Sequence, residues 1–182
     1  MKKISDKDLI HMLADSRTQR EGFSAMVSQY SEQLYWKVRH IVLSHDDAND
    51  VLQNTFIKAW NNLETFQGKS SVSTWLYRIA INEALDMVRK QKVRAGVSAD
   101  EEPTMANRLL ADEYFDGDEV QAQLQEAVAH LPDVQRTVFS MKYFDEMKYS
   151  DISKILNTTE GALKASYHLA VKKIVAYFKL HD

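Results

Sequence analysis

Apolar side chains recur every three or four residues through long stretches of this sequence, a spacing typical of amphipathic helices. An early stripe consists of Phe23, Met26, Val27, Tyr30, Leu34, Val38 and Ile41. A late stripe consists of Leu163, Tyr167, Ala170, Ile174 and Tyr177. Only 5 Gly and 2 Pro occur among 182 residues, which favours long helices over strands. The sequence therefore predicts an all-α fold.

The composition indicates the cellular compartment in which the chain works. There is no Cys, which excludes a disulfide framework and a thiolate metal site and fits a reducing cytoplasm. The N-terminal residues lack the apolar run of a signal peptide. No stretch approaches the roughly 20 apolar residues that are needed to span a bilayer. We expect a soluble protein of the cytoplasm.

Charge is distributed unevenly, although the net charge is only -3. Residues 68–94 hold six basic and two acidic side chains, whereas residues 99–119 hold eight acidic side chains and one arginine. A basic segment followed by an acidic one is thus hidden in a nearly neutral total.

The acidic stretch shows no sustained periodicity and is longer than most connections inside a compact domain. We therefore predict two small helical domains, residues 1–95 and 118–182, joined by a flexible acidic linker, residues 96–117. A short helix is predicted at 107–113. Two small domains on such a linker have a weak mutual interface by default, so we expect them to open and close.

Polar residues mark where individual helices begin and end. His45–Asp47 offers an N-cap for a helix that continues to about Leu63, and Ser71 or Ser73 can cap a helix that ends near Lys92. The apolar spacing of this second helix places Trp75 in the core.

The C-terminal residues predict a short helix, a turn and a longer helix. Ser150 can cap a helix over 151–156, which Asn157 can stop in a left-handed conformation. Thr159 can cap a helix from Glu160 to about Lys179. This succession is the pattern of a helix-turn-helix.

Two segments together resemble a known family. The stretch from Asp47 to Lys92 resembles region two of extracytoplasmic-function (ECF) sigma factors through Asp50 with Gln53, the run Trp75-Leu76-Tyr77-Arg78-Ile79-Ala80, and Asn82 with Asp86. The stretch from Leu131 to Ile174 resembles region four, the promoter-binding helix-turn-helix. The resemblance implies an alternative sigma factor of the sigma-70 superfamily, which binds core RNA polymerase through its β and β′ subunits and directs it to selected promoters.

The helix after Asp47 carries a polar stripe opposite its apolar face, and the resemblance implies that this stripe binds the β′ clamp helices. Asn54 stands where the family usually has an acidic residue, which removes one charge from this surface. The stripe consists of Asp50, Gln53, Asn54, Ile57, Trp60 and Asn61.

The loop from Phe66 to Ser73 and the helix after it resemble the element that reads the −10 promoter sequence. Melted DNA is held by basic side chains and by rings or pockets that accept unstacked bases, and an Asn can pair with a base edge. The predicted −10 residues are Phe66, Lys69, Tyr77, Arg78, Asn82 and Arg89.

The exposed face of the last helix is expected to enter the major groove at the −35 element, because small residues allow close approach and Lys and His can reach bases or phosphates. Ala165, Ser166 and Leu169 stand where the family usually has Ser and Arg, so the usual −35 sequence is not expected. The predicted −35 residues are Thr159, Gly161, Lys164, Ala165, His168 and Lys172.

Other function classes remain as alternatives. One is a helix-turn-helix transcriptional regulator that acts without core polymerase, and another is an interaction module that has lost promoter recognition. An enzyme is not expected, because the 5 Gly form no phosphate loop and no Ser lies in a nucleophile motif. We therefore predict no catalytic residue, metal, cofactor or small-molecule ligand. The resemblance also implies promoter DNA and an anti-sigma factor, soluble or membrane-bound, as partners.

Overall fold

A computed structural model describes residues 3–66, 68–95 and 119–181, and these residues form helices without any strand. This confirms the predicted all-α fold for the described part of the chain. The N-terminal half contains α1 (Asp6–Ala14), α2 (Gln19–Val42), α3 (His45–Asn61), the 3₁₀ turn η1 (Leu63–Thr65) and α4 (Val72–Ala95). The C-terminal half contains α6 (Glu119–Ala129), α7 (Asp133–Tyr143), α8 (Tyr149–Leu156) and α9 (Glu160–His181).

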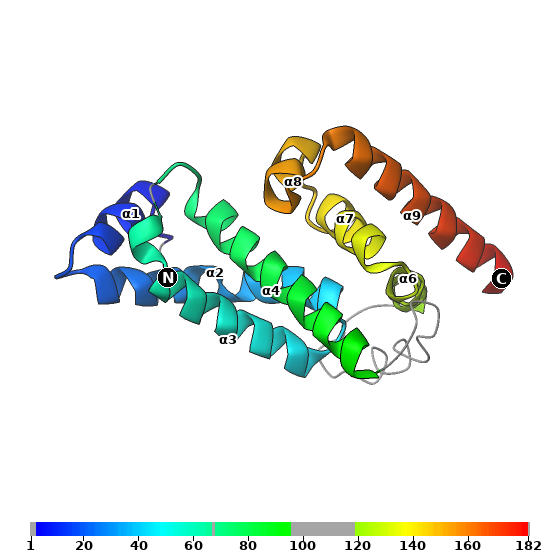
Figure 1. The fold of residues 1–182 in the computed structure, drawn as a ribbon, viewed down its shortest axis with the longest axis horizontal. Coiled ribbons are helices and arrows are strands. Elements are labelled where there is room, and N and C mark those ends of the chain that lie inside the picture. Colours follow the sequence, from blue (N-terminus) through cyan, green and yellow to red (C-terminus); the bar gives the residue numbers. More distant parts are fainter. Residues whose placement is uncertain (1–2, 67, 96–118, 182) are drawn as a thin grey trace.

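The N-terminal half is a bundle in which α2, α3 and α4 pack against one another and α1 packs on α2 (Figure 1). Each long helix turns one apolar face inward, as its spacing predicts. The fully buried side chains include Met26, Val38, Val51, Leu76 and Ile81.

The first helix, α1, was not predicted from the sequence. Its Ser5 side chain accepts a hydrogen bond from the backbone N–H of Asp8 at 3.1 Å, which caps the helix. Gly22 allows α1 to lie close to α2, since a Cβ atom at this position would meet the Cβ of Met12 at 2.7 Å.

The helix-turn-helix prediction agrees with the structure in its main features. Asn157 ends α8 in a left-handed conformation with φ of 51°, and the Thr159 hydroxyl accepts from the backbone N–H of Ala162 at 3.2 Å. The prediction for Ser150 was wrong, because α8 begins at Tyr149 and Lys148 occupies the N-cap without a side-chain hydrogen bond. The late apolar stripe faces inward: Leu163, Ala170 and Ile174 are buried.

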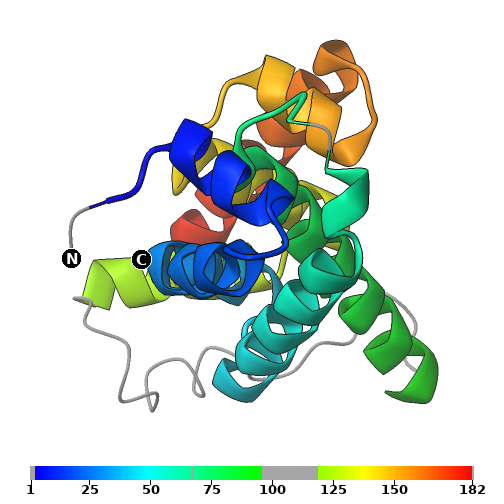
Figure 2. The same ribbon diagram turned by 90° about the vertical axis from the view of Figure 1, so that its left-hand side faces the viewer.

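The two halves are packed together rather than separate. α7 lies along α2, and α8 lies against α4 (Figures 1 and 2). Val138, Met141 and Ile152 belong to the same buried cluster as Leu76 and Ile81 of the N-terminal half. The expectation of a weak mutual interface therefore does not describe this conformation, because an apolar core runs across both halves.

The predicted linker and its short helix at 107–113 lie outside the described residues. Within the described residues, none of the helices has the length and apolar character needed to cross a membrane.

Candidate nucleic-acid and polymerase interfaces

The polar stripe on α3 lies on the surface of the protein. Ser44 caps this helix by accepting from the backbone N–H of Asp47 at 3.4 Å, so the predicted cap at His45–Asp47 lies one residue too late. The exposed fractions of Ile57 and Trp60 are 52% and 38%, so two large apolar side chains lie on an otherwise polar face. All six predicted residues are exposed: Asp50, Gln53, Asn54, Ile57, Trp60 and Asn61.

The Trp60 ring is held in place although it is exposed. It meets the Phe23 ring edge-on, with 4.9 Å between the ring centroids. A ring that is fixed in this way loses little conformational freedom when a partner covers it.

The predicted −10 residues fall into two environments. Lys69, Arg78, Asn82 and Arg89 are exposed on α4 and the loop before it, and Arg89 pairs with Asp86 at 3.2 Å. Phe66 is partly buried, with its ring centroid 4.6 Å from that of Trp75. Trp75 packs against the core, as its spacing predicted.

Tyr77 is the exception among the predicted −10 residues, because it is buried between the two halves with an exposed fraction of 4%. Its hydroxyl donates a hydrogen bond to the carboxylate of Asp145, in the segment between α7 and α8. The same carboxylate pairs with the Lys37 ammonium at 3.0 Å, and this ammonium also lies 4.5 Å from the Tyr77 ring centroid. We call Lys37, Tyr77 and Asp145 the Asp145 cluster.

The surroundings of Tyr77 in the Asp145 cluster keep its hydroxyl protonated. Burial raises the pKa of Tyr77 well above its usual range, and the negative Asp145 carboxylate raises it further. The phenol therefore stays protonated and remains a donor. The sequence offers no signal for this cluster, because its members lie on α2, α4 and the α7–α8 turn and meet only in the tertiary structure.

The predicted −35 face is open along its whole length. Thr159 caps α9, and the Lys164 ammonium lies 5.7 Å from the Tyr149 ring centroid, in the range of a cation–π contact. The structure thus gathers the predicted residues on one accessible side of the second helix of the helix-turn-helix. All six are exposed: Thr159, Gly161, Lys164, Ala165, His168 and Lys172.

Metal-binding groups do not gather in the described part of the chain. Over residues 3–66, 68–95 and 119–181, no cluster of three or more His, Cys, Asp or Glu side chains could hold a metal ion. His45 instead contacts the Tyr35 hydroxyl at 2.7 Å and the Asn49 amide at 2.9 Å.

Each half of the chain matches a family model of its own, and the two models follow each other along the sequence. The family model for sigma-70 region 2 matches residues 26–94, and that for sigma-70 region 4 matches residues 121–174. The ECF RNA polymerase sigma factor SigW of Bacillus subtilis is 33% identical over 158 residues, which cover 82% of this chain and 84% of SigW. The chain belongs to the ECF sigma factor family. It is therefore an alternative sigma factor, a transcription initiation factor that binds core RNA polymerase and directs it to selected promoters.

More distant relatives extend the comparison over most of the sigma factor. The RNA polymerase sigma-H factor of Pseudomonas aeruginosa is 27% identical over 177 residues, covering 88% of this chain and 86% of that protein. The solved structure of CnrH in complex with the cytosolic domain of CnrY has a TM-score of 0.70 at 20% identity, covering 97% of this chain and 99% of CnrH. The structure of RpoE with the anti-sigma factor NepR from Bartonella quintana has a TM-score of 0.68 at 22% identity, covering 89% of this chain and 99% of that one. These structures share the fold.

His40 lies at the contact between the two halves. Its ring stacks on Phe144 with 4.3 Å between centroids, and burial lowers its pKa to about 4. The positive charges of Arg39 and Lys37 lower it further, whereas the Asp145 carboxylate opposes the shift. His40 is therefore neutral in the packed protein, while an exposed His takes up a proton below about pH 6.5.

We predict that the packed form loses stability as the pH falls from about 6.5 towards 4, because only the unfolded or separated state binds the proton. Between pH 7 and 5.5 the contribution of His40 to the free energy of unfolding should fall by about 1 kcal/mol. Urea unfolding at both pH values measures this loss. His40→Phe, which keeps a ring against Phe144 but cannot titrate, should lose that part of the pH dependence. An unchanged dependence in the variant would contradict the assignment.

Proposed function

We propose that residues 1–95 of this sigma factor bind core polymerase and the −10 element, and that residues 118–182 bind the −35 element, with 96–117 as the linker. The exposed apolar pair Ile57 and Trp60 on an otherwise polar stripe is the observation that supports the polymerase surface most directly. We place the protein in the cytoplasm, because core polymerase acts there. The catalysis belongs to the polymerase, and the chain itself is not an enzyme.

The proposed polymerase contact is the α3 stripe. Ile57 and Trp60 supply apolar anchors at its centre, and Asp50, Gln53 and Asn54 supply a polar rim. This is the usual layout of a protein interface with a few dominant residues. The β and β′ subunits are the proposed partners.

The proposed promoter contacts lie on α4 and α9. Lys69, Arg78 and Arg89 provide the positive groove that single-stranded DNA requires, and Asn82 provides one donor and one acceptor for a base edge. On α9, Lys164 and His168 are exposed beside Gly161 and Ala165, whose small side chains leave room for the groove floor.

We further propose an anti-sigma factor, soluble or membrane-bound, as the regulatory partner. One protein of the same fold, RpoE, was solved with the anti-sigma factor NepR, and another, CnrH, was solved with the cytosolic domain of CnrY. The exposed Ile57 and Trp60 also favour a covering partner when polymerase is absent. Since the chain has no Cys, thiol-based sensing would reside in that partner.

Ile57→Asp should weaken binding to core polymerase by about 30-fold or more, because a charge replaces a central apolar anchor of about 2 kcal/mol. Val120→Asp is the matched control, since Val120 is 65% exposed on α6 outside the stripe. Affinity for fluorescently labelled core enzyme is the measurement, with circular dichroism to verify the helices. Equal weakening by both variants would refute the surface assignment.

Lys164→Ala and His168→Ala should each reduce discrimination between a matched and a scrambled −35 element by roughly 1–3 kcal/mol if the side chain contacts a base. A contact to phosphate alone would instead weaken both DNAs equally and flatten the salt dependence. Run-off transcription and footprinting with holoenzyme measure these effects. Run-off transcription by core polymerase that does not require this chain would favour a helix-turn-helix regulator that acts without core polymerase. Equal protection of the matched and the scrambled DNA by wild-type holoenzyme would refute specific recognition of the −35 element.

A further inference from the structure

The Tyr149 ring connects the two helices of the helix-turn-helix. Tyr149 is the first residue of α8, and the ammonium group of Lys164 on α9 lies 5.7 Å from the centroid of its ring. The Lys142 ammonium on α7 lies 5.1 Å from the same centroid. Tyr149 is partly buried, whereas Lys164 is exposed on the face that we propose for the −35 element. A ring on the first helix thus contacts a DNA-facing cation on the second.

The position of this ring is itself fixed by its neighbours. It meets the Tyr167 ring edge-on, with 6.4 Å between the centroids, and Tyr167 stacks on the buried Phe139 ring at 5.7 Å. The Lys142 ammonium also donates a hydrogen bond to the backbone carbonyl of Met147 at 3.0 Å, which closes the turn before α8. The ring is therefore part of the packed helix-turn-helix and offers a fixed contact to the lysine on α9.

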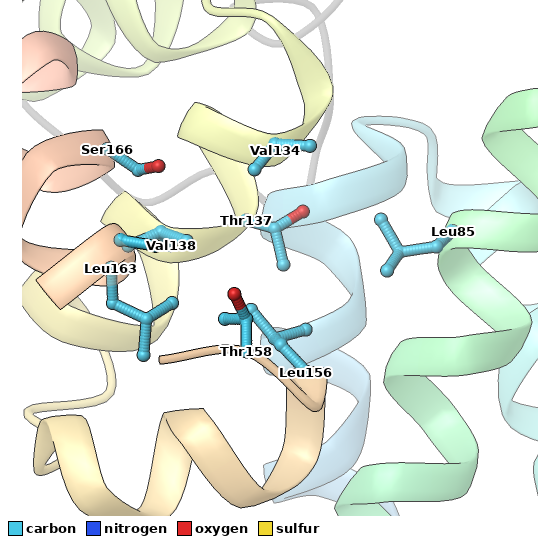
Figure 3. Close-up of a pocket in the computed structure, with 9 residues that line it drawn as sticks. Leu85, Val134, Thr137, Val138, Leu156, Thr158, Leu163 and Ser166 are labelled. Atoms are coloured by element: carbon cyan, nitrogen blue, oxygen red, sulfur yellow. The ribbon is translucent and has the colours of Figure 1, made fainter. Parts of the chain in front are cut away.

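Apolar packing fixes the backbone of α9 beside this ring. Leu156 of α8 and Leu163 of α9 line one pocket of about 180 Å³, which Leu85 of α4 also lines (Figure 3). Leu163 is almost fully buried, so Lys164, the next residue, is turned out of this core. The long side chain of a lysine still samples many rotamers on a fixed backbone, and binding has to remove that freedom. A cation–π contact restricts it before DNA arrives.

We propose that Tyr149 is a positioning residue for recognition of the −35 element, which acts through Lys164 by holding its ammonium group in place. This proposal rests on the proposed −35 role of Lys164. The attraction comes from the face of the aromatic ring and does not need the phenol hydroxyl. An aliphatic side chain would fill the same space without attracting the cation.

Tyr149→Leu should reduce the discrimination of holoenzyme between a matched and a scrambled −35 element about threefold, because the contact that restricts Lys164 is lost. Tyr149→Phe, which keeps the ring, should retain the discrimination of the wild type. Tyr143→Leu is the matched control, since it removes an exposed ring of α7 that stacks on Phe139. The affinity of holoenzyme for the two labelled DNAs is the measurement, with circular dichroism to verify the helices.

A double-mutant cycle separates a role through Lys164 from a general loss of stability. In a Lys164→Ala background, Tyr149→Leu should cause no further loss of discrimination. An equal loss in both backgrounds, or unchanged discrimination in Tyr149→Leu alone, would overturn the positioning role. If Tyr149→Leu does not fold, pentafluorophenylalanine at this position decides in the same way, because it keeps the ring shape but no longer attracts a cation. Full discrimination by Lys164→Ala would refute the proposed function of that lysine, and the positioning role with it.

A different observation concerns the loop before α4. The Asp6 carboxylate accepts from the backbone N–H of Val72 at 3.0 Å and from the Tyr30 hydroxyl at 2.9 Å. The Gln29 side chain accepts from the N–H of Ile4 at 2.8 Å and donates to its C=O at 3.1 Å, which fixes the segment that carries Asp6. Asp6 thus caps α4 from 66 residues upstream, at the point where the predicted −10 loop ends.

The start of α4 therefore has two side-chain caps. The Ser71 hydroxyl accepts from the backbone N–H of Thr74 at 3.1 Å, and Asp6 supplies the partner for Val72. Val72 and Tyr30 are both buried, so loss of the carboxylate would leave two donors that water cannot readily satisfy. The local cap holds the first turn together, whereas the remote cap holds that turn against α1 and α2.

We infer that Asp6 is a positioning residue for the −10 loop, which acts through the backbone of Val72. Asp6 lies before the segment 26–94 that the region-2 model matches. The carboxylate fixes the start of α4 against α2, and this sets where the loop that carries Lys69 joins the helix. This inference rests on the proposed role of that loop.

Asp6→Ala should reduce promoter melting by holoenzyme about fivefold or more while leaving core-polymerase affinity unchanged, because the start of α4 loses its partner. Asp6→Asn, which keeps one acceptor oxygen, should restore part of the melting. Permanganate reactivity of −10 thymines is the measurement. Asp8→Ala is the matched control, since Asp8 lies in the same first turn of α1 and its carboxylate accepts from the Ser5 hydroxyl.

Two outcomes would overturn the positioning role of Asp6: a parallel loss of melting and polymerase affinity, or full melting by a folded Asp6→Ala. If Asp6→Ala does not fold, Tyr30→Phe decides in the same way, because it removes one of the two bonds to the carboxylate and should lower melting less. Absence of melting by wild-type holoenzyme would instead refute the proposed function.

Discussion

The carboxylate of Asp145 lies between two halves of a chain whose sequence gives little reason for them to meet. A buried carboxylate is costly unless it is paired and hydrogen-bonded. Lys37 supplies the counter-charge and Tyr77 supplies a proton, each from a different helix of the N-terminal half. This pairing needs α2, α4 and the α7–α8 turn together, so it forms only when the two halves are packed.

The consequences of this placement differ between the functional surfaces. The α3 stripe and the outer face of α9 remain exposed, so the surfaces proposed for polymerase and for the −35 element are accessible in the packed protein. Tyr77 is covered, and Leu85 faces the C-terminal half. Under the proposed −10 role of Tyr77, initiation requires a conformational step in which contacts within the chain give way to contacts with polymerase and promoter.

The sequence predicts those features that depend on local spacing. Periodicity placed Leu163, Ala170 and Ile174 inside and left Lys164 and His168 outside, and capping chemistry identified Asn157 and Thr159. Ser150 failed as a cap because Tyr149 already begins the helix, a one-residue difference that packing decides. Asp6 and Asp145 were missed because their partners lie 66 and 68 residues away from them in sequence. Local patterns carry no information about such pairs.

The central claim, that one chain holds a packed free form and an open promoter-bound form, is tested most directly by a distance between the halves. The chain has no Cys, so Asp86→Cys on α4 and Lys154→Cys on α8 provide unique sites for a donor and an acceptor dye. Both positions are exposed and lie on helices that pack together. We predict efficient energy transfer in the free protein and its loss when core polymerase and promoter DNA are both added. Low transfer in the free protein, or equally high transfer in the promoter complex, would contradict the account.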